Sequence, residues 1–355
     1  MEKDAPSSLS PAENRLLVWL GTSFFSSQLP PLGWEVIQRP HEPGLIRSWS
    51  HILELTGGRV PAAVLAADSS LPPHLTGMES FPCLTLFYAV DSHIHSWYPL
   101  YAQGFDVCLV SLRDHLPDFT RHRLRPDLVW WFPPFARIQD QPPPPEARPE
   151  PEWPLLFVGT VNASLHPVRA AFLEEVKNAV PGLHVTRGAF ADLYPRALLV
   201  LNECSRGDLN FRVFEALGCG ACLLTPAVGH GQADLFSDRR DLFLYPPGDA
   251  AALAALAGAL LRDEPLRART AQNGLAVVNA SHRSSHRART LSDNLGALLD
   301  TGEASRLAAA RRKEARALHA RFLRPLYLHH AETTSFLSLR QAYLAAAKTV
   351  PAETA

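Results

Sequence analysis

Residues 207–226, GDLNFRVFEALGCGACLLTP, predict a helix that runs directly into a buried strand. Asp208 stands where the helix N-cap is expected, because its carboxylate can accept hydrogen bonds from the first free N–H groups. Gly218 and Gly220 end the helix, and the apolar run ACLLTP begins the strand. A helix that connects two strands in this way is typical of a parallel sheet covered by helices.

The same alternation of short apolar runs and helical stretches extends along the chain in both directions. Several runs are apolar almost without interruption, as expected of strands buried on both faces. We therefore predict an α/β fold with two doubly wound, Rossmann-like domains in series and a helical C-terminal tail. Strands are expected to begin at Leu16, Ala62, Cys83, Asp106, Asp127, Pro154, Leu183, Ala197, Ala221 and Asp241, and helices at Pro167 and near Leu209.

A proline-rich stretch, QDQPPPPEARPEPEWP, marks the domain boundary. Four successive prolines supply no hydrogen-bond donors to a helix or a sheet, so a stiff, extended linker is expected. The predicted organisation is a flexible N-terminus at 1–13, an N-terminal domain at 14–138, the linker at 139–153, a C-terminal domain at 154–300 and the helical tail at 301–355.

The composition is that of an ordinary globular protein, with 46% hydrophobic and 19% charged residues among 355. A formal net charge of -1 provides no field that would concentrate nucleic acid, so no nucleic-acid partner is expected. Five cysteines in a chain of this length do not make a disulfide framework. With no apolar N-terminal segment and no run near the length of a membrane span, a cytoplasmic location is expected.

Asp208, Arg212 and Glu215 follow one another at i, i+4 and i+7 of the expected helix, so they share one side of it. One interpretation is a solvated stripe of helix ion pairs. The other is a ligand site, because a helix that follows a buried strand begins at the crevice where doubly wound sheets bind ligands. There Arg212 suits a phosphate and Glu215 a pair of sugar hydroxyls.

Cys219 and Cys222 form a CxxC pair in the same stretch. A redox pair normally opens a helix, where the helix dipole lowers the thiol pKa, whereas this pair follows a helix. No second pair of ligands at zinc spacing is evident. We therefore expect two buried thiols that pack as small apolar side chains.

Three segments in the right order resemble the glycosyltransferases related to the spore-maturation protein CgeB, a branch of the GT-B type. The most specific is LNFRVFEALGCGACLLTP, which resembles the hallmark segment of that family. LLFVGTVNASLHPVRAAFLEEV resembles the first strand, glycine turn and helix of its donor domain, and NGLAVVNASHRSSHRARTLSDNL its closing helical segment. The likeness covers roughly residues 80–298 and is strongest over 155–298.

The resemblance implies a GT-B architecture, in which two Rossmann-like domains face each other across a cleft. The C-terminal domain then binds a nucleoside-diphosphate-sugar donor, and the N-terminal domain binds a hydroxyl acceptor of unknown identity. Glu215 matches the glutamate that binds the nucleotide ribose, Arg212 would lie toward the diphosphate, and Asn210 near the sugar or phosphate. Gly159 and Thr160 match the glycine turn beside the diphosphate.

Arg187, which closes the run LHVTRG, is a further candidate for the diphosphate, the alternative being an exposed arginine at a strand end. The chain departs from the Glu-x7-Glu pattern of retaining group-one enzymes, because Gly207 occupies the first position and Asp208 comes one residue late. The stereochemical outcome is therefore open. No Asp-x-Asp motif occurs, which favours metal-independent GT-B chemistry with no metal site and no cofactor.

The N-terminal half carries Asp91, His93 and His95 directly after an expected buried strand. A histidine or carboxylate there could deprotonate an acceptor hydroxyl, and Asp91 and His93 are the leading candidates for the catalytic base. The alternatives are that Asp91 caps the following helix and the histidines only pack, or that the histidines bind a metal with an unseen third ligand. Asp106 is expected to be structural.

The tail contains a series of basic residues among alanines and leucines. GT-B chains commonly end by crossing back to the first domain, which is the first interpretation. The second is a basic helix that touches a membrane or a partner. The residues concerned are Arg311, Arg312, Lys313, Arg316, Arg321 and Arg324.

The sequence thus predicts a glycosyltransferase that acts in the interdomain cleft. A non-hydrolysing nucleotide-sugar epimerase and an inactive nucleotide-binding scaffold are the alternatives. A dinucleotide-dependent oxidoreductase is disfavoured, because LGTSFFSS after the first strand lacks the glycine pattern of a pyrophosphate turn.

Overall fold

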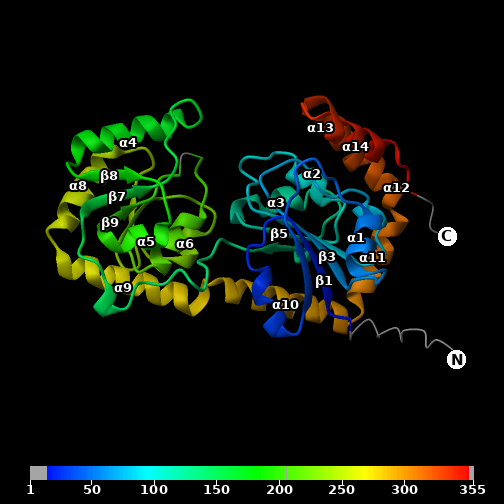
Figure 1. The fold of residues 1–355 in the computed structure, drawn as a ribbon, viewed down its shortest axis with the longest axis horizontal. Coiled ribbons are helices and arrows are strands. Elements are labelled where there is room, and N and C mark those ends of the chain that lie inside the picture. The colour runs from blue at the N-terminus through cyan, green and yellow to red at the C-terminus, as the bar shows by residue number, and fades with distance from the viewer. Residues whose placement is uncertain (1–13, 205, 352–355) are drawn as a thin grey trace. The chain divides into compact units, whose positions relative to one another are not determined.

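The structure is a computed structural model that describes residues 14–204 and 206–351. The expected flexible segment at 1–13 lies outside the described residues. The chain forms two compact units (Figure 1). The described part of unit 1 comprises residues 14–111, 115–132 and 288–351, and unit 2 comprises residues 112–114 and 133–287.

Unit 1 is built on a six-stranded parallel sheet in the order β2-β1-β3-β4-β5-β6. The order reverses direction between β1 and β3, as in doubly wound folds. Gly21 follows β1 with a φ of 99°, and a Cβ at this position would lie 2.2 Å from the carbonyl oxygen of Ala67, so only glycine fits. The strands are β1 Leu16–Leu20, β2 Glu35–Arg39, β3 Ala63–Ala67, β4 Leu84–Ala89, β5 Val107–Val110 and β6 Val129–Trp131.

Strand β2 was not expected from the sequence. Three of its five residues, EVIQR, are polar, and only one of its edges is paired, because it lies at the end of the sheet. An edge strand needs fewer apolar residues than a central strand, so the apolar-run signal is weak there.

The helices of unit 1 include the C-terminal segment, which packs on the core of this unit through Leu323, Leu326 and Tyr327. This packing agrees with the first interpretation of the tail, and Arg311, which is completely buried there, does not belong to the exposed basic helix of the second interpretation. Lys313, by contrast, is exposed. The helices are α1 Trp49–Thr56, α2 Tyr98–Ala102, α3 Leu116–Phe119, α11 Glu303–Lys313, α12 Ala315–Leu318, α13 Arg324–Thr333 and α14 Leu337–Lys348, with a π-helical turn at His319–Leu323.

Unit 2 has a five-stranded parallel sheet in the order β11-β10-β9-β7-β8, with apolar clusters on both faces. Pro167 lies in the first turn of α4, as expected. The strands are β7 Trp153–Val158, β8 Leu183–Thr186, β9 Ala197–Leu201, β10 Leu223–Pro226 and β11 Phe243–Tyr245. The helices are α4 Pro167–Ala179, α5 Phe190–Leu193, α6 Phe211–Gly218, α7 Gln232–Leu235, α8 Ala250–Leu261 and α9 Glu264–Ser281.

The unit boundaries differ from the expected ones in two places. Residues 139–153 lie within unit 2. Helix α10, Ser284–Asp300, leaves unit 2 after Arg287, so the change of unit falls there and not after residue 300. Arg287 donates to the carbonyl oxygens of Pro133 and Pro134 in unit 2, whereas Ser292, later in α10, accepts a buried hydrogen bond from the indole of Trp34 in unit 1.

None of the helices within residues 14–204 and 206–351 combines the length and the apolar character that crossing a bilayer requires.

Candidate active site

The candidate site of unit 2 lies where the strand order of its sheet reverses. Strand β7 has β8 on one side and β9 on the other, so the reversal falls between β7 and β9. Gly159 follows β7, and Asn202 follows β9. Doubly wound sheets bind ligands outside the carboxyl ends of the strands at such a point.

Arg212 spans this reversal point from the first turn of α6. Its Nε donates to the carbonyl oxygen of Val158 at 3.1 Å, and its Nη1 donates to Oδ1 of Asn202 at 2.9 Å. Its guanidinium also lies over the ring of Phe157, 5.2 Å from the centroid. The contacts at the ends of β7 and β9 hold a positive charge in one place, which suits recognition of a phosphate.

Gly159 makes room for this arginine. A Cβ at Gly159 would lie 3.0 Å from Nη2 of Arg212 and 3.0 Å from the ring of Phe157. The N–H of Gly159 donates to the carbonyl oxygen of Thr186 in β8, so this group is already paired. Thr160 is exposed, and its carbonyl oxygen accepts a hydrogen bond from Arg169.

The first turn of α6 differs from the expectation. The N-cap is Asn210 and not Asp208, and the side chain of Asn210 makes no capping hydrogen bond. Its amide instead pairs with the amide of Asn202, at 3.2 and 3.3 Å in the two directions. Asp208 therefore precedes the helix, and the expected stripe of three charges on one helical face is reduced to Arg212 and Glu215.

Glu215 is half-buried one turn after Arg212. Burial and the nearby charge of Asp140 raise its pKa to about 7, while Arg212 and Arg137 act in the opposite direction. Asp140 comes from the proline-rich stretch that was expected to be a linker, and no sequence pattern pointed to it. The carboxylate of Glu215 has no hydrogen bond to any residue that the structure describes, which leaves its oxygens available to a ligand.

Arg187 is exposed directly after β8. Among residues 14–204 and 206–351, its guanidinium has no hydrogen bond or ion pair, so it does not share the contacts of Arg212. Its contribution to the diphosphate stays a prediction.

In unit 1, Asp91 follows β4, and a residue that the sequence did not single out positions it. Asp68, buried after β3, accepts hydrogen bonds from the N–H groups of Val90 and Asp91 at 2.8 and 2.7 Å. Burial and the charge of Asp68 raise the pKa of Asp91. A carboxylate with a raised pKa is a stronger proton acceptor, which is what a general base needs.

The two histidines lie in the same turn as Asp91. The N–H of His95 donates to the carbonyl oxygen of Asp91 at 3.0 Å, and His93 and His95 both act electrostatically on the Asp91 carboxyl group. Ser70 Oγ lies 3.1 Å from Nε2 of His95 and also forms a hydrogen bond with the side chain of Asp91. The structure therefore brings the expected catalytic residues together and adds Asp68 and Ser70.

Comparison with known proteins bears on the same regions. Residues 147–293 match a family model described as glycosyl transferase-like. Two similar solved structures are HepE from Anabaena, determined in complex with UDP and glucose, and a glycosyltransferase from Rickettsia africae. Their identities are 12% and 8%, they cover 80% and 81% of this chain and 100% and 99% of their own, and their TM-scores are 0.57 and 0.58.

A third is the sucrose-phosphate synthase of Thermosynechococcus elongatus, with 13% identity, coverage of 81% of this chain and 100% of that chain, and a TM-score of 0.56. The fold is that of the GT-B glycosyltransferases. At these identities the likeness concerns the fold alone. No curated protein sequence matches the chain.

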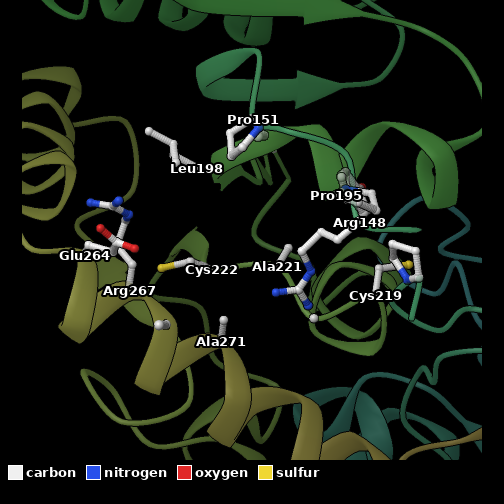
Figure 2. A pocket seen from close by; sticks show the side chains of 15 residues that line it. Arg148, Pro151, Pro195, Leu198, Cys219, Ala221, Cys222, Glu264, Arg267 and Ala271 are labelled. Carbon is white, nitrogen blue, oxygen red and sulfur yellow. The ribbon is translucent and has the colours of Figure 1, made fainter. Parts of the chain in front are cut away.

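A second pocket lies at the opposite edge of the unit 2 sheet (Figure 2). It lies beside the amino ends of the strands, with Cys219 and Cys222 in its wall. Its volume is about 180 Å³, which is small for a nucleotide sugar. Both thiols are free, and burial raises the pKa of each to about 12, so they are inert apolar side chains, in agreement with the sequence interpretation.

Substitution of Glu215 by Gln is expected to change how the stability of unit 2 depends on pH. The folded-state pKa of about 7 lies above the ordinary value of 4.5, so wild-type stability should fall as the pH rises through this interval. Gln has no charge, so the variant should gain about 1–3 kcal/mol relative to wild type by pH 8 and little at pH 4.5. Thermal melts followed by circular dichroism at pH 4.5, 6, 7 and 8 measure this difference. A difference that stays constant over this range would contradict the assignment.

Proposed function

We propose that the protein is a glycosyltransferase that moves a sugar from a nucleoside-diphosphate sugar to a hydroxyl acceptor without a metal ion. The observation that carries the proposal is the guanidinium of Arg212, held between the ends of β7 and β9. The glycosyl transferase-like match covers these residues, and the solved HepE complexes contain UDP and UDP-glucose. The quoted hallmark segment supports placement in the CgeB-related branch.

The diphosphate of the donor is the group that Arg212 would bind. When the bond from the sugar to the diphosphate breaks, negative charge grows on the leaving oxygen, and a fixed cation stabilises that charge more in the transition state than in the ground state. Glu215 lies one turn further along α6 and would accept hydrogen bonds from the two ribose hydroxyls. Asn210, Asp208, Thr160 and Arg187 stay candidates for contacts to the sugar or the phosphates.

The acceptor hydroxyl would be deprotonated in unit 1. Asp91 is the leading base, because its pKa is raised by burial and by Asp68 and because a turn fixes its position. His93 interacts electrostatically with it and is the second candidate. A base that removes this proton as the sugar carbon is attacked would make the hydroxyl a stronger nucleophile.

The first test is nucleotide binding, followed by product analysis. We expect UDP, and a UDP-sugar, to raise the melting temperature of the full chain, because a ligand that binds only the folded state stabilises it by mass action. GDP, ADP and dTDP in parallel identify the base, and uridine at the same concentration tests whether the diphosphate is needed. A panel of hydroxyl acceptors with the best donor, followed by NMR, then detects the transferred sugar.

The outcomes separate the alternatives. Interconversion of the donor into a second nucleotide sugar without any acceptor would identify an epimerase. Nucleotide binding with no product on any acceptor would support the inactive scaffold. If no nucleoside diphosphate shifts the melting temperature at millimolar concentration, the proposed donor site is wrong.

A further inference from the structure

Unit 1 contains a cavity of about 590 Å³ beside the carboxyl ends of β2 and β3. Three segments that are distant in the sequence enclose it: the loop after β2, the loop after β3, and the turn between α13 and α14. Tyr343 on α14 donates from its hydroxyl to the carbonyl oxygen of Pro73 at 2.7 Å, which fastens the helical segment to the loop after β3. The volume is within the range of about 300–1,000 Å³ that small-molecule sites occupy.

The lining of this cavity is mostly apolar and carries no fixed charge. Besides two histidines, its polar side chains are the hydroxyls of Thr333, Thr334, Ser335, Ser338 and Tyr343. Proline, leucine, isoleucine and aromatic side chains form most of it, and no Asp, Glu, Lys or Arg contributes. Its two histidines are His41 and His330, and burial lowers the pKa of both, that of His330 to about 4, so both are neutral at pH 7. Because an ion would lose its hydration here without gaining a partner, the cavity suits an uncharged apolar group.

The mouth of the cavity exposes further apolar surface. Phe336, in the turn between α13 and α14, is 66% exposed, and Leu71 is 45% exposed. Ser338 and Gly44 both line the cavity and lie close together, with the Oγ of Ser338 3.7 Å from the position that a Cβ of Gly44 would take. A large exposed apolar side chain beside an apolar cavity indicates a binding surface, because covering it with an apolar ligand removes apolar area from water.

The cavity adjoins the turn that carries the candidate base. Ser70, which contacts Asp91 and His95, immediately precedes the cavity residue Leu71. On the other side, the ring of His330 lies 5.0 Å from that of Trp97 and interacts electrostatically with His95. A molecule whose apolar part fills the cavity could thus present a polar end at the Asp91 turn.

We propose that this cavity holds the hydrocarbon tail of an amphiphilic acceptor, whose hydroxyl head lies at the Asp91–His95 turn. This proposal rests on the glycosyltransferase function proposed above and narrows its acceptor to alcohols or glycosides that carry an aliphatic chain. The tail contributes binding energy away from the reacting atoms, and the turn contributes the base.

The test compares n-decyl β-glucoside with n-butyl β-glucoside, both below their micelle-forming concentrations, by calorimetric titration of the full chain. Each methylene that enters an apolar site raises affinity by about threefold to fourfold, so the decyl compound should bind about a hundredfold more tightly or better. Its binding should also show a negative heat-capacity change. Equal affinities for the two glucosides would overturn the proposal.

A substitution that fills the cavity locates the binding. We expect Ser338→Trp to weaken decyl glucoside binding by about tenfold or more, since loss of even two methylene contacts has that effect. Gln341→Trp introduces the same side chain at an exposed position of α14 that does not line the cavity, and it should bind like wild type. Undiminished binding to Ser338→Trp would mean that the tail lies elsewhere.

Two further measurements keep this proposal separate from the donor proposal. The shift in melting temperature with UDP should be the same in wild type, Ser338→Trp and Gln341→Trp, which also shows that the variants are folded. If decyl glucoside binds but UDP does not change the melting temperature, only the donor-site proposal is wrong. If UDP raises the melting temperature but decyl glucoside does not bind, only the cavity proposal is wrong. The protein could instead float with phosphatidylcholine vesicles, lose this binding in Ser338→Trp and fail to bind the monomeric glucoside. That result would assign the cavity to membrane binding and overturn an acceptor role.

Discussion

Replacement of Arg212 by Gln is expected to lower the rate of sugar transfer by about a hundredfold to a thousandfold, the usual effect of removing one donor from a site where negative charge develops. The same substitution should remove most of the thermal stabilisation by UDP, because the fixed cation that faces the diphosphate is lost. Initial rates with saturating donor and melting curves with and without UDP measure the two effects.

The geometry explains why this arginine is needed and why lysine should replace it only in part. Nε and Nη1 are occupied by Val158 and Asn202, and Nη2 lies at the turn that Gly159 keeps open. Lysine keeps the charge but has no rigid fork that could contact both strand ends and a phosphate at once. Arg212→Lys should therefore recover part of the UDP affinity and less of the rate.

Arg196→Gln is the matched control. Arg196 belongs to the same unit and lies over the ring of Trp153 much as Arg212 lies over Phe157, but it precedes β9 at the amino edge of the sheet. It should affect neither UDP binding nor transfer. If Arg212→Gln lowered the melting temperature without nucleotide while leaving transfer by the folded protein intact, Arg212 would be a structural residue only.

Much of the fold follows from local patterns in the sequence. Short apolar runs predicted every strand of the described residues except β2, which was missed because an edge strand of composition EVIQR lacks such a run. The position at which the chain passes from unit 2 back to unit 1 depends on the contacts that individual residues of α10 make. Periodicity does not report that, since the helix itself continues without a break from Ser284 to Asp300.

The site was predictable where a residue's place follows from its own element, and less so where it depends on distant segments. Arg212 and Glu215 could be placed because their helix follows a buried strand. Asp208 was misplaced because the pairing between Asn210 and Asn202, eight residues apart, occurs where the helix begins. The role of Asp68 and the cavity of unit 1 could not be predicted from local sequence, because both depend on loops that are distant in the sequence and come together only in the fold.

Replacement of Arg311 by Met is expected to destabilise unit 1 by about 3–5 kcal/mol, the usual effect of breaking a completely buried ion pair. Arg311 and Asp106 are both 0% exposed and form a direct ion pair. Arg311 also donates to the carbonyl oxygen of Cys83 at 3.0 Å and to Oγ1 of Thr85 at 2.7 Å. It thereby joins the C-terminal segment to the sheet, and its loss leaves a buried carboxylate whose remaining partners are the N–H and Oγ1 of Thr85 and, at 3.5 Å, Arg123.

Urea unfolding followed by tryptophan fluorescence measures this effect on the correct unit, because every tryptophan except Trp153 lies in unit 1. Lys313→Met, an exposed position two residues further along, should stay within about 0.5 kcal/mol of wild type. In the double variant Arg311→Met with Asp106→Leu, the loss should be smaller than the sum of the two single losses by about 1–3 kcal/mol, because no charge is left unpaired. Additive losses would show that the two side chains act independently, and that the C-terminal segment is held to unit 1 by its apolar contacts alone.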